Sequence, residues 1–156
     1  MRRRPSSRVV LLDPADRVLL IRLEETGFVI DGVPMPSTYW ITPGGGLEAG
    51  ESHEGAAYRE LFEETGIDDL VLGPMIFEQE GNFSLAGEIV RAVEHYFVGW
   101  ISTTDVSFDH IDDNERSVFR EPRWWTRRTV EAAAPNTTIF PETFAGLYDQ
   151  ALATPR

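Results

Sequence analysis

The chain has 156 residues, a formal net charge of −12 from 26 acidic and 14 basic side chains, and no cysteine; all of its basic residues are arginines. Its length is that of one ordinary domain. The missing lysine excludes Schiff-base chemistry and a P-loop lysine, and the missing cysteine excludes thiol nucleophiles and disulfides. The negative charge disfavours a protein that holds duplex nucleic acid by its phosphates.

The apolar segments do not fit a membrane protein. No apolar run approaches the ~20 residues that a helix needs to span a bilayer. The start Met1-Arg-Arg-Arg resembles that of a signal peptide, but Asp13, Asp16 and Arg17 interrupt the apolar stretch that follows it. We therefore predict a cytoplasmic protein with no membrane contact.

The first part of the chain favours strands. We predict a flexible N-terminal segment at residues 1–7, then strands at 8–13 and 17–23 around a turn that contains Pro14. Residues 24–37 contain two glycines and two prolines without a clear period, which is typical of an exposed loop. A short strand is predicted at 39–41, directly before the run Thr42-Pro-Gly-Gly-Gly46.

A helix is predicted from His53 to Glu64. Ser52 is suited to cap its start, and Glu54 falls near its positive end. Gly66 is suited to end it, because glycine readily adopts the left-handed conformation that follows a helix.

The second half of the chain continues the mixed pattern. Strands are predicted at 69–78 and 89–101, joined as a hairpin through Gly81–Gly87, and a short strand at 123–126 precedes a helix that begins near Arg127. The last helix is predicted at 141–152, because its apolar residues share one face: Phe144, Leu147, Tyr148, Ala151 and Leu152. The sequence therefore predicts one mixed α/β domain over residues 8–152 and a C-terminal tail at 153–156.

Three carboxylates crowd one side of the predicted helix at 53–64. Glu60, Glu63 and Glu64 stand at spacings of three and four residues, where like charges destabilise an isolated helix by about 0.2–0.5 kcal/mol per pair. A cation would relieve that repulsion, and oxygen ligands without nearby sulfur or imidazole suit Mg²⁺ or Mn²⁺. From the spacing alone, an acidic helix face exposed to solvent is the alternative.

The residues before this helix complete a longer pattern. Gly45 is followed after five residues by Glu51 and after seven more by Arg59-Glu60-Leu61-Phe62-Glu63-Glu64-Thr65-Gly66-Ile67. This segment, Gly45 to Ile67, resembles the Nudix box of MutT-like Nudix hydrolases at every defined position. The resemblance implies a Nudix fold, an α/β/α sandwich with a mixed β-sheet in a single domain. It also implies hydrolysis of a pyrophosphate bond in a nucleoside diphosphate linked to another moiety.

The resemblance also assigns roles to the residues of the box. It implies Glu60 and Glu64 as the principal ligands of Mg²⁺, for which Mn²⁺ is a substitute. Glu63 would assist them, and the Gly45 carbonyl would complete the set. Arg59 and Glu51 would fix the rotamers of the glutamates.

The general base is left open between two sources. One is Glu60, within the box. The other is a carboxylate outside it, for which Glu115, in the polar run Asp112-Asp-Asn-Glu-Arg116, is preferred over Glu121 and Glu94.

Other residues are assigned from their position relative to the box. Tyr39, Phe28 and Phe83 are candidates to stack on a nucleobase, as is Trp40, although core packing is preferred for it. Arg91 or Arg22 is a candidate for a terminal phosphate. The three histidines, which are isolated from one another in sequence, are predicted to be structural: His53, His95 and His110.

The substrate and the partners are less constrained. Features that would suggest ADP-ribose, dinucleoside polyphosphates or coenzyme A are not apparent, which leaves nucleoside triphosphates or nucleotide sugars as the favoured small-molecule substrates. A catalytically silent nucleotide-binding sensor of the same fold is the alternative, which the four retained box carboxylates disfavour. A decapping-type enzyme is disfavoured by the lack of a basic track. Relatives are often dimers, so a homodimer is one expectation.

Overall fold

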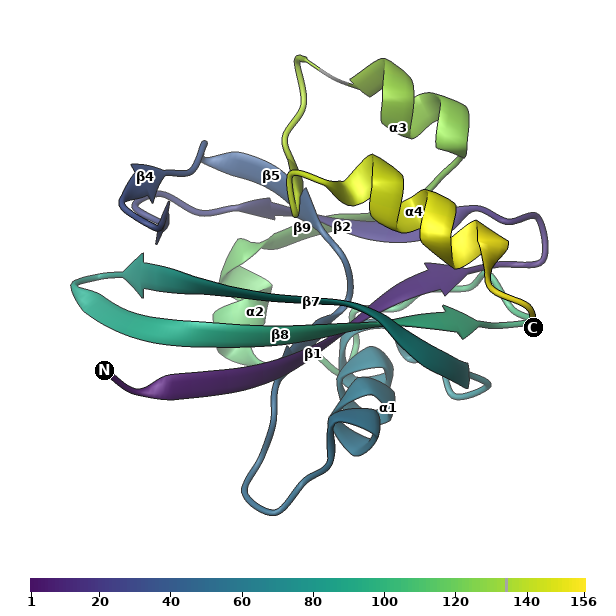
Figure 1. Cartoon of the computed structure of the whole chain (residues 1–156), viewed down its shortest axis with the longest axis horizontal. Helices are drawn as coiled ribbons and strands as arrows, with labels where there is room; N and C mark the ends of the chain where they lie inside the picture. Colours follow the sequence, from purple (N-terminus) through teal and green to yellow (C-terminus); the bar gives the residue numbers. More distant parts are fainter. Residues whose placement is uncertain (134) are drawn as a thin grey trace.

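A mixed β-sheet lies between two layers of helices (Figure 1). The computed structural model of the chain describes residues 1–133 and 135–156. The strands are β1 (Arg3–Leu12), β2 (Val18–Glu24), β3 (Val29–Ile30), β4 (Val33–Pro34), β5 (Thr38–Ile41), β6 (Gly44–Gly46), β7 (Val71–Leu85), β8 (Glu88–Trp100), β9 (Phe119–Trp125) and β10 (Ile139–Phe140). The helices are α1 (His53–Thr65), α2 (Asp113–Val118), α3 (Arg127–Ala133) and α4 (Phe144–Ala153).

The strand order explains how the glycine-rich segment reaches the middle of the sheet. The order is β10-β5-β2-β1-β8-β7-β3-β4, with β6 paired to β1 and β9 paired to β2. β1 runs parallel to β8, whereas β7 and β8 form an antiparallel hairpin, so the sheet is mixed. β6 pairs antiparallel with residues 6–8 of β1, which holds Gly44–Gly46 beside the centre of β1.

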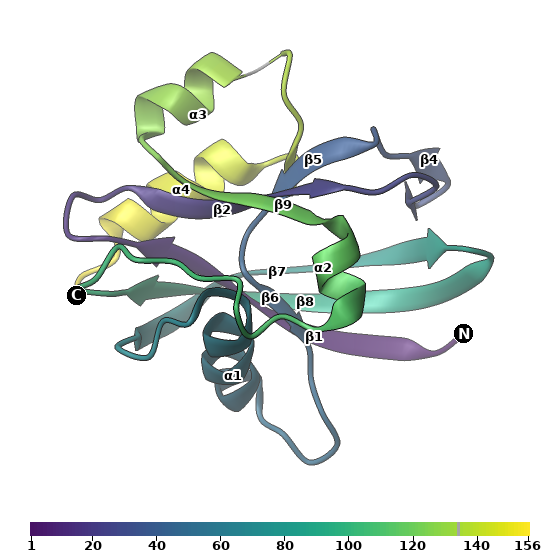
Figure 2. The same cartoon turned by 180° about the vertical axis from the view of Figure 1, so that it is seen from behind.

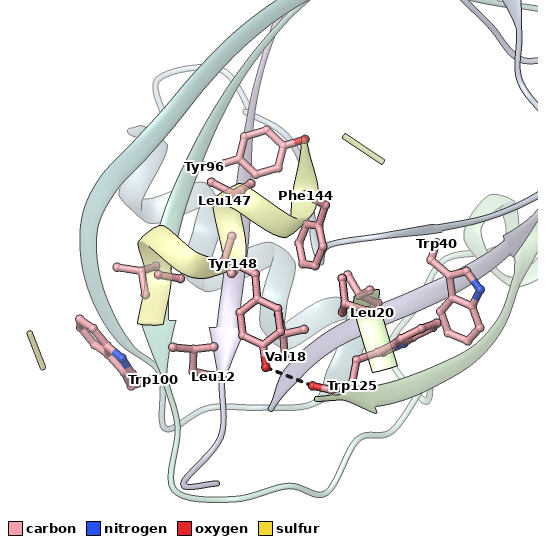
Figure 3. Close-up of a cluster of buried hydrophobic side chains, with 14 residues drawn as sticks. Leu12, Val18, Leu20, Trp40, Tyr96, Trp100, Trp125, Phe144, Leu147 and Tyr148 are labelled. Carbon is pink, nitrogen blue, oxygen red and sulfur yellow. Dashed lines mark hydrogen bonds between the residues drawn. The ribbon is translucent and has the colours of Figure 1, made fainter. Parts of the chain in front are cut away.

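The two faces of β1 build two cores. Successive side chains of a strand point to opposite faces, so Val10 and Leu12 pack with α3 and α4, whereas Val9 and Leu11 pack with α1. Figure 3 shows the first core, in which the hydroxyl of Tyr148 on α4 donates a hydrogen bond to the Trp125 carbonyl at 3.3 Å. This layering confirms the predicted α/β/α sandwich with a mixed sheet.

Most of the predicted elements are present. The strand pair around Pro14, the helix after Ser52, the long hairpin and the C-terminal amphipathic helix all form. The hairpin is longer than predicted, because β7 continues to Leu85. Among the described residues, none of the helices has the length and apolar character that crossing a membrane would require.

The N-terminal residues differ from the prediction. Residues 1–7 were expected to be a flexible segment, but β1 begins at Arg3, and its residues 3–7 pair with Arg91–His95 of β8. Their side chains are mostly polar because this part of the strand lies beyond the two cores. A hydrophobic pattern therefore could not indicate it.

Further short elements were not predicted: β3, β4, β6, β10 and α2. The loop at 24–37 contains the paired strands β3 and β4. α2 forms in the polar run that begins at Asp112, where a capping box joins the side chains and backbones of Asp112 and Glu115. This reciprocal capping satisfies backbone donors that the start of a helix would otherwise leave unpaired.

Candidate active site

α1 directs its acidic residues toward β6, because the ends and the apolar face of this helix are fixed. The Ser52 hydroxyl accepts a hydrogen bond from the Gly55 backbone N–H at 3.0 Å, and Gly66 ends the helix with φ 74°. Ala57 and Leu61 are buried against β1 and β2. Since residues of a helix advance by about 100° each, burying these two residues turns Glu60 and Glu64 toward β6.

A group of three carboxylates forms where α1 meets α2. Glu60, Glu64 and Glu115 each offer an oxygen atom, and these atoms all lie within 4.8 Å of one another. α2, which leads directly into β9 (Figure 2), delivers Glu115 to this group. We refer to Glu60, Glu64 and Glu115 as the carboxylate triad.

Glu64 is the most constrained member of the triad. It is fully buried, and its Oε1 accepts a hydrogen bond from the Gly44 backbone N–H at 2.7 Å. Its Oε2 is buried without a hydrogen-bond partner among the described residues. Burial raises the pKa of Glu64 well above its usual value; Arg8 opposes this shift, whereas Glu60 and Glu115 add to it. A cation within the triad would satisfy the unpaired oxygen and offset the repulsion.

Gly45 makes room for Glu60. A Cβ at position 45 would lie 2.7 Å from the Glu60 carboxyl carbon and 2.8 and 2.9 Å from its two oxygens. Any larger residue at this position would therefore displace a triad carboxylate. The spacing to Glu51 had singled out Gly45 among the three consecutive glycines, and the structure gives that choice a steric reason.

Arg59 ties the remaining acidic residues of α1 to the loop before it. Its Nε and Nη2 donate to the two carboxylate oxygens of Glu51 at 2.8 and 2.9 Å, and its Nη1 donates to Glu60 at 3.0 Å and Glu63 at 3.1 Å. Its Nη2 also donates to the Gly46 carbonyl at 3.0 Å. The hydrogen bonds from Arg59 lower the pKa of Glu51 to about 2. Arg59 therefore orients one triad member and links it to β6.

The structure groups the predicted metal ligands differently from the sequence. Glu60 and Glu64 belong to the triad, but Glu63 lies outside it, with its side chain 42% exposed and paired to Arg59. Glu115, predicted as a general base, occupies the third place. Burial, followed by the repulsion of Asp112, Glu60 and Glu63, raises its pKa, while the Asp112 backbone N–H opposes the shift.

The two other candidate bases are held in ion pairs. Glu121 on β9 pairs with Arg22 and with Arg123, each at 3.1 Å. Glu94 on β8 is buried and pairs with the Arg8 Nε at 3.0 Å. Neither carboxylate belongs to the triad.

The triad opens into a cavity of about 630 Å³. Aromatic side chains from five different elements or loops also line it: Phe28, Tyr39, Phe83, Phe119 and Phe140. Phe28 stacks on Tyr39 with ring centroids 6.1 Å apart and meets Phe83 edge-on at 5.5 Å. Tyr39, Phe28 and Phe83 thus lie where a nucleobase could stack, whereas Trp40 packs against Trp125 in the core, as preferred from the sequence.

The two arginines proposed for a terminal phosphate lie elsewhere. Arg91 pairs with Glu80 at 3.1 Å, and Arg22 pairs with Glu24 at 2.7 Å and with Glu121. Neither is among the residues that line the cavity. Both candidates are therefore corrected, since each guanidinium is already neutralised on the sheet surface.

Two histidines that are far apart in sequence meet in the fold. The rings of His53 and His95 stack with centroids 3.8 Å apart at an interplanar angle of 7°, and the Ser7 hydroxyl lies 3.2 Å from His53 Nδ1. Neither residue lines the cavity. His110 stacks on Phe62 at 5.0 Å. These contacts agree with the structural role predicted for the histidines.

Two basic residues of the cavity, Arg4 and Arg8, were not predicted from the sequence. Arg4, Ser6 and Arg8 line the cavity from one face of β1. Arg8 donates to Glu94 and to the carbonyls of Thr42 and Gly44 at 3.2 and 3.1 Å. In a strand, residues 4, 6 and 8 share one face, so this spacing could have indicated that they lie together. It was not used because residues 1–7 were expected to be a flexible segment.

The chain is similar in sequence to known proteins. The NUDIX domain family matches residues 2–144. The uncharacterized Nudix hydrolase YvcI of Bacillus subtilis is 29% identical over 104 residues, which are 67% of this chain and 54% of that protein. The chain thus spans about half the length of this curated relative.

Solved structures show the same fold. The MutT protein of Methanosarcina mazei has a TM-score of 0.60 at 22% identity, covering 97% of this chain and 94% of the other. The dihydroneopterin triphosphate pyrophosphohydrolase of E. coli has a TM-score of 0.64 at 19% identity, covering 96% of each chain.

Proposed function

The chain belongs to the Nudix hydrolase family, and from this premise we propose that it is a metal-dependent pyrophosphohydrolase of small nucleotides. The reaction is attack of water on phosphorus, which cleaves a pyrophosphate bond in a nucleoside diphosphate-linked substrate. Nucleoside triphosphates and nucleotide sugars are the favoured substrates.

The observation that carries this proposal is the unpaired Oε2 of Glu64 within the carboxylate triad. Three oxygen donors from carboxylates, one of them fully buried, suit a hard divalent cation such as Mg²⁺, or Mn²⁺ in its place. Glu60, Glu64 and Glu115 would hold it. When bound, such an ion polarises a phosphoryl oxygen and lowers the pKa of a bound water.

The residues around the triad supply the remaining steps. Arg59 holds Glu60 in place, and the Gly44 backbone N–H holds Glu64. Glu115 is the preferred candidate to accept the proton of the attacking water, because it lies within the carboxylate triad. Glu60 is the alternative base. The roles of the Gly45 carbonyl as a ligand and of Glu63 as an assisting group stay predictions.

The shape of the cavity supports a nucleotide. The triad would face the pyrophosphate, and the aromatic side chains Phe28, Tyr39 and Phe83 would contact the base. The Glu25 carboxylate, which also lines the cavity, accepts a hydrogen bond from the Tyr39 hydroxyl at 3.4 Å. A polar group within an aromatic wall is a common way to orient a ligand.

A substrate panel tests the proposal. Nucleoside triphosphates and nucleotide sugars are incubated with Mg²⁺ or Mn²⁺ in ¹⁸O-water, and the products are identified by mass spectrometry. We expect metal-dependent turnover with ¹⁸O in a phosphate product. Glu64→Gln should lower it at least about a hundredfold, whereas Glu54→Gln, on the exposed first turn of the same helix, should leave it unchanged.

The same panel separates the enzyme from a sensor. Nucleotide binding without turnover of any compound would contradict the enzyme and favour a silent binding domain of the same fold. A homodimeric state and a cytoplasmic location stay predictions from the sequence.

A further inference from the structure

Arg4 is a basic side chain of the cavity that forms no ion pair with a carboxylate of the described residues. Within residues 1–133 and 135–156, the arginines without a carboxylate oxygen inside 4.0 Å are Arg4, Arg116 and Arg128. Of these, Arg4 alone lines the cavity of the triad. Its donors are therefore available to a ligand.

The strand geometry explains why this side chain has room in the cavity. Arg4 shares a face of β1 with Ser6 and Arg8, and its register partner on β8 is the small residue Ala92. On its other side a Cβ added to Gly46 would lie 3.0 Å from the Arg4 Nε. The small residues Gly46 and Ala92 thus flank the guanidinium and leave space for a ligand beside it.

The two other arginines of the cavity are already occupied. Arg8 pairs with Glu94, and Arg59 pairs with Glu51, Glu60 and Glu63. Partial desolvation, followed by repulsion from Arg8, lowers the pKa of Arg4, although Glu60 opposes this shift. An anion beside Arg4 would relieve that repulsion.

We propose that Arg4 binds a substrate phosphate other than the two phosphates joined by the cleaved pyrophosphate bond. Arg4 would thereby select nucleoside triphosphates over nucleotide sugars. The proposal rests on the proposed function. A triphosphate carries one phosphate more than the pyrophosphate group of a nucleotide sugar, and that phosphate needs a cation of its own. The planar guanidinium donates two parallel hydrogen bonds to a phosphate. Arg4 acts here as a specificity-determining residue.

The test compares Arg4→Ala with a matched control on the same strand. Arg3→Ala is the control, because successive side chains alternate, so Arg3 lies on the opposite face of β1, where it pairs with Glu80 at 3.2 Å. For each protein, kcat and KM are measured with a nucleoside triphosphate and with a nucleotide sugar of the same base. Dissociation constants for both compounds are measured by calorimetry, and Mn²⁺ affinity is measured without nucleotide.

Arg4→Ala should raise KM and Kd for the triphosphate roughly ten- to a hundredfold, the loss typical of a hydrogen bond between charged groups. The values for the nucleotide sugar and for Mn²⁺ should stay unchanged, as should all values of Arg3→Ala. Arg4→Lys should recover part of the triphosphate affinity, because it restores the charge but not the fork of donors.

The outcomes separate the two proposals. Equal losses for both nucleotides, or no loss for either, would overturn the role of Arg4 while leaving the hydrolase proposal intact. Absence of turnover in the unaltered protein would instead contradict the hydrolase, and the binding constants would then still decide whether Arg4 selects a triphosphate.

Discussion

Glu64 combines full burial, one hydrogen bond and one unpaired oxygen beside two other carboxylates. Ionising a carboxyl in a protein interior without a paired cation costs folding free energy, which is why burial raises the pKa of Glu64. The metal-free protein is therefore expected to be strained at this residue, and a bound cation relieves the strain. Stability and metal binding should consequently respond in opposite directions to neutralisation of Glu64.

Glu64→Gln tests this opposition. The amide keeps an acceptor for the Gly44 N–H and adds a donor toward the other triad carboxylates, so the metal-free variant should melt a few degrees higher than the unaltered protein. Its melting temperature should then no longer rise with Mn²⁺. Differential scanning calorimetry with and without Mn²⁺ measures both effects. A variant that melts lower without metal, and still gains stability with metal, would contradict the assignment.

The pH dependence of metal binding follows from the same residues. In the metal-free fold the pKa values of Glu60, Glu64 and Glu115 are raised, with burial as the largest cause. Between the usual carboxyl pKa and these raised values, the folded protein binds more protons than the unfolded one, so its stability falls as the pH rises. Cations compete with these protons.

The rise in melting temperature on adding Mn²⁺ should therefore be larger at pH 8 than at pH 6. Calorimetry at matched ionic strength and metal concentration measures it, with Glu54→Gln as the control that should follow the unaltered protein. A shift that is equal at both pH values would show that these carboxylates do not take up protons where the metal binds.

At the scale of elements, α1 could be predicted from the sequence, whereas α2 could not. α1 carries a cap at Ser52, a stop at Gly66 and an apolar face through Ala57 and Leu61, all of which are local signals. α2 has no buried residue, so no hydrophobic period marked it. It still places Glu115 in the triad.

The start of β1 could not be predicted from the sequence for a related reason. Its pairing with β8 joins residues that are about 90 positions apart, such as Arg4 and Ala92, and its side chains are mostly polar. Long-range backbone pairing leaves no local pattern in such a segment. The sequence therefore predicted Glu60, Glu64 and Gly45 from one contiguous motif but did not reveal Arg4.

The capping box of α2 offers a test at this scale. The Asp112 carboxylate accepts a hydrogen bond from the Glu115 backbone N–H at 2.7 Å, and the Asp112 N–H donates to the Glu115 side chain at 3.2 Å. Asp112→Ala removes the first bond, at a typical cost of about 1 kcal/mol. It should also loosen Glu115.

We expect Asp112→Ala to lower kcat more than it raises KM, and Asp112→Asn, which retains a capping oxygen, to recover most of the rate. Steady-state kinetics together with melting temperatures measure both effects. Asp113→Ala, an exposed neighbour in the same turn, serves as the control. Unchanged kinetics in Asp112→Ala would show that α2 does not position Glu115 for the reaction.

At the scale of the whole molecule, two cores on opposite faces of one sheet leave a cavity where α1, α2 and β6 meet. Its walls provide the carboxylates of the triad, several aromatic rings and Arg4. A protein of net charge −12 repels a polyphosphate unless cations intervene. The fold places three carboxylates to gather such cations where the phosphates would lie.

We propose that the carboxylate triad binds the divalent cation on which pyrophosphate hydrolysis depends. A Mn²⁺ titration followed by electron paramagnetic resonance, with nucleoside triphosphate turnover recorded in parallel, tests this role of the triad. Turnover should rise with bound Mn²⁺ in the unaltered protein, and Glu64→Gln should lose both binding and turnover. Turnover without any divalent cation, or undiminished Mn²⁺ binding and turnover in Glu64→Gln, would contradict it.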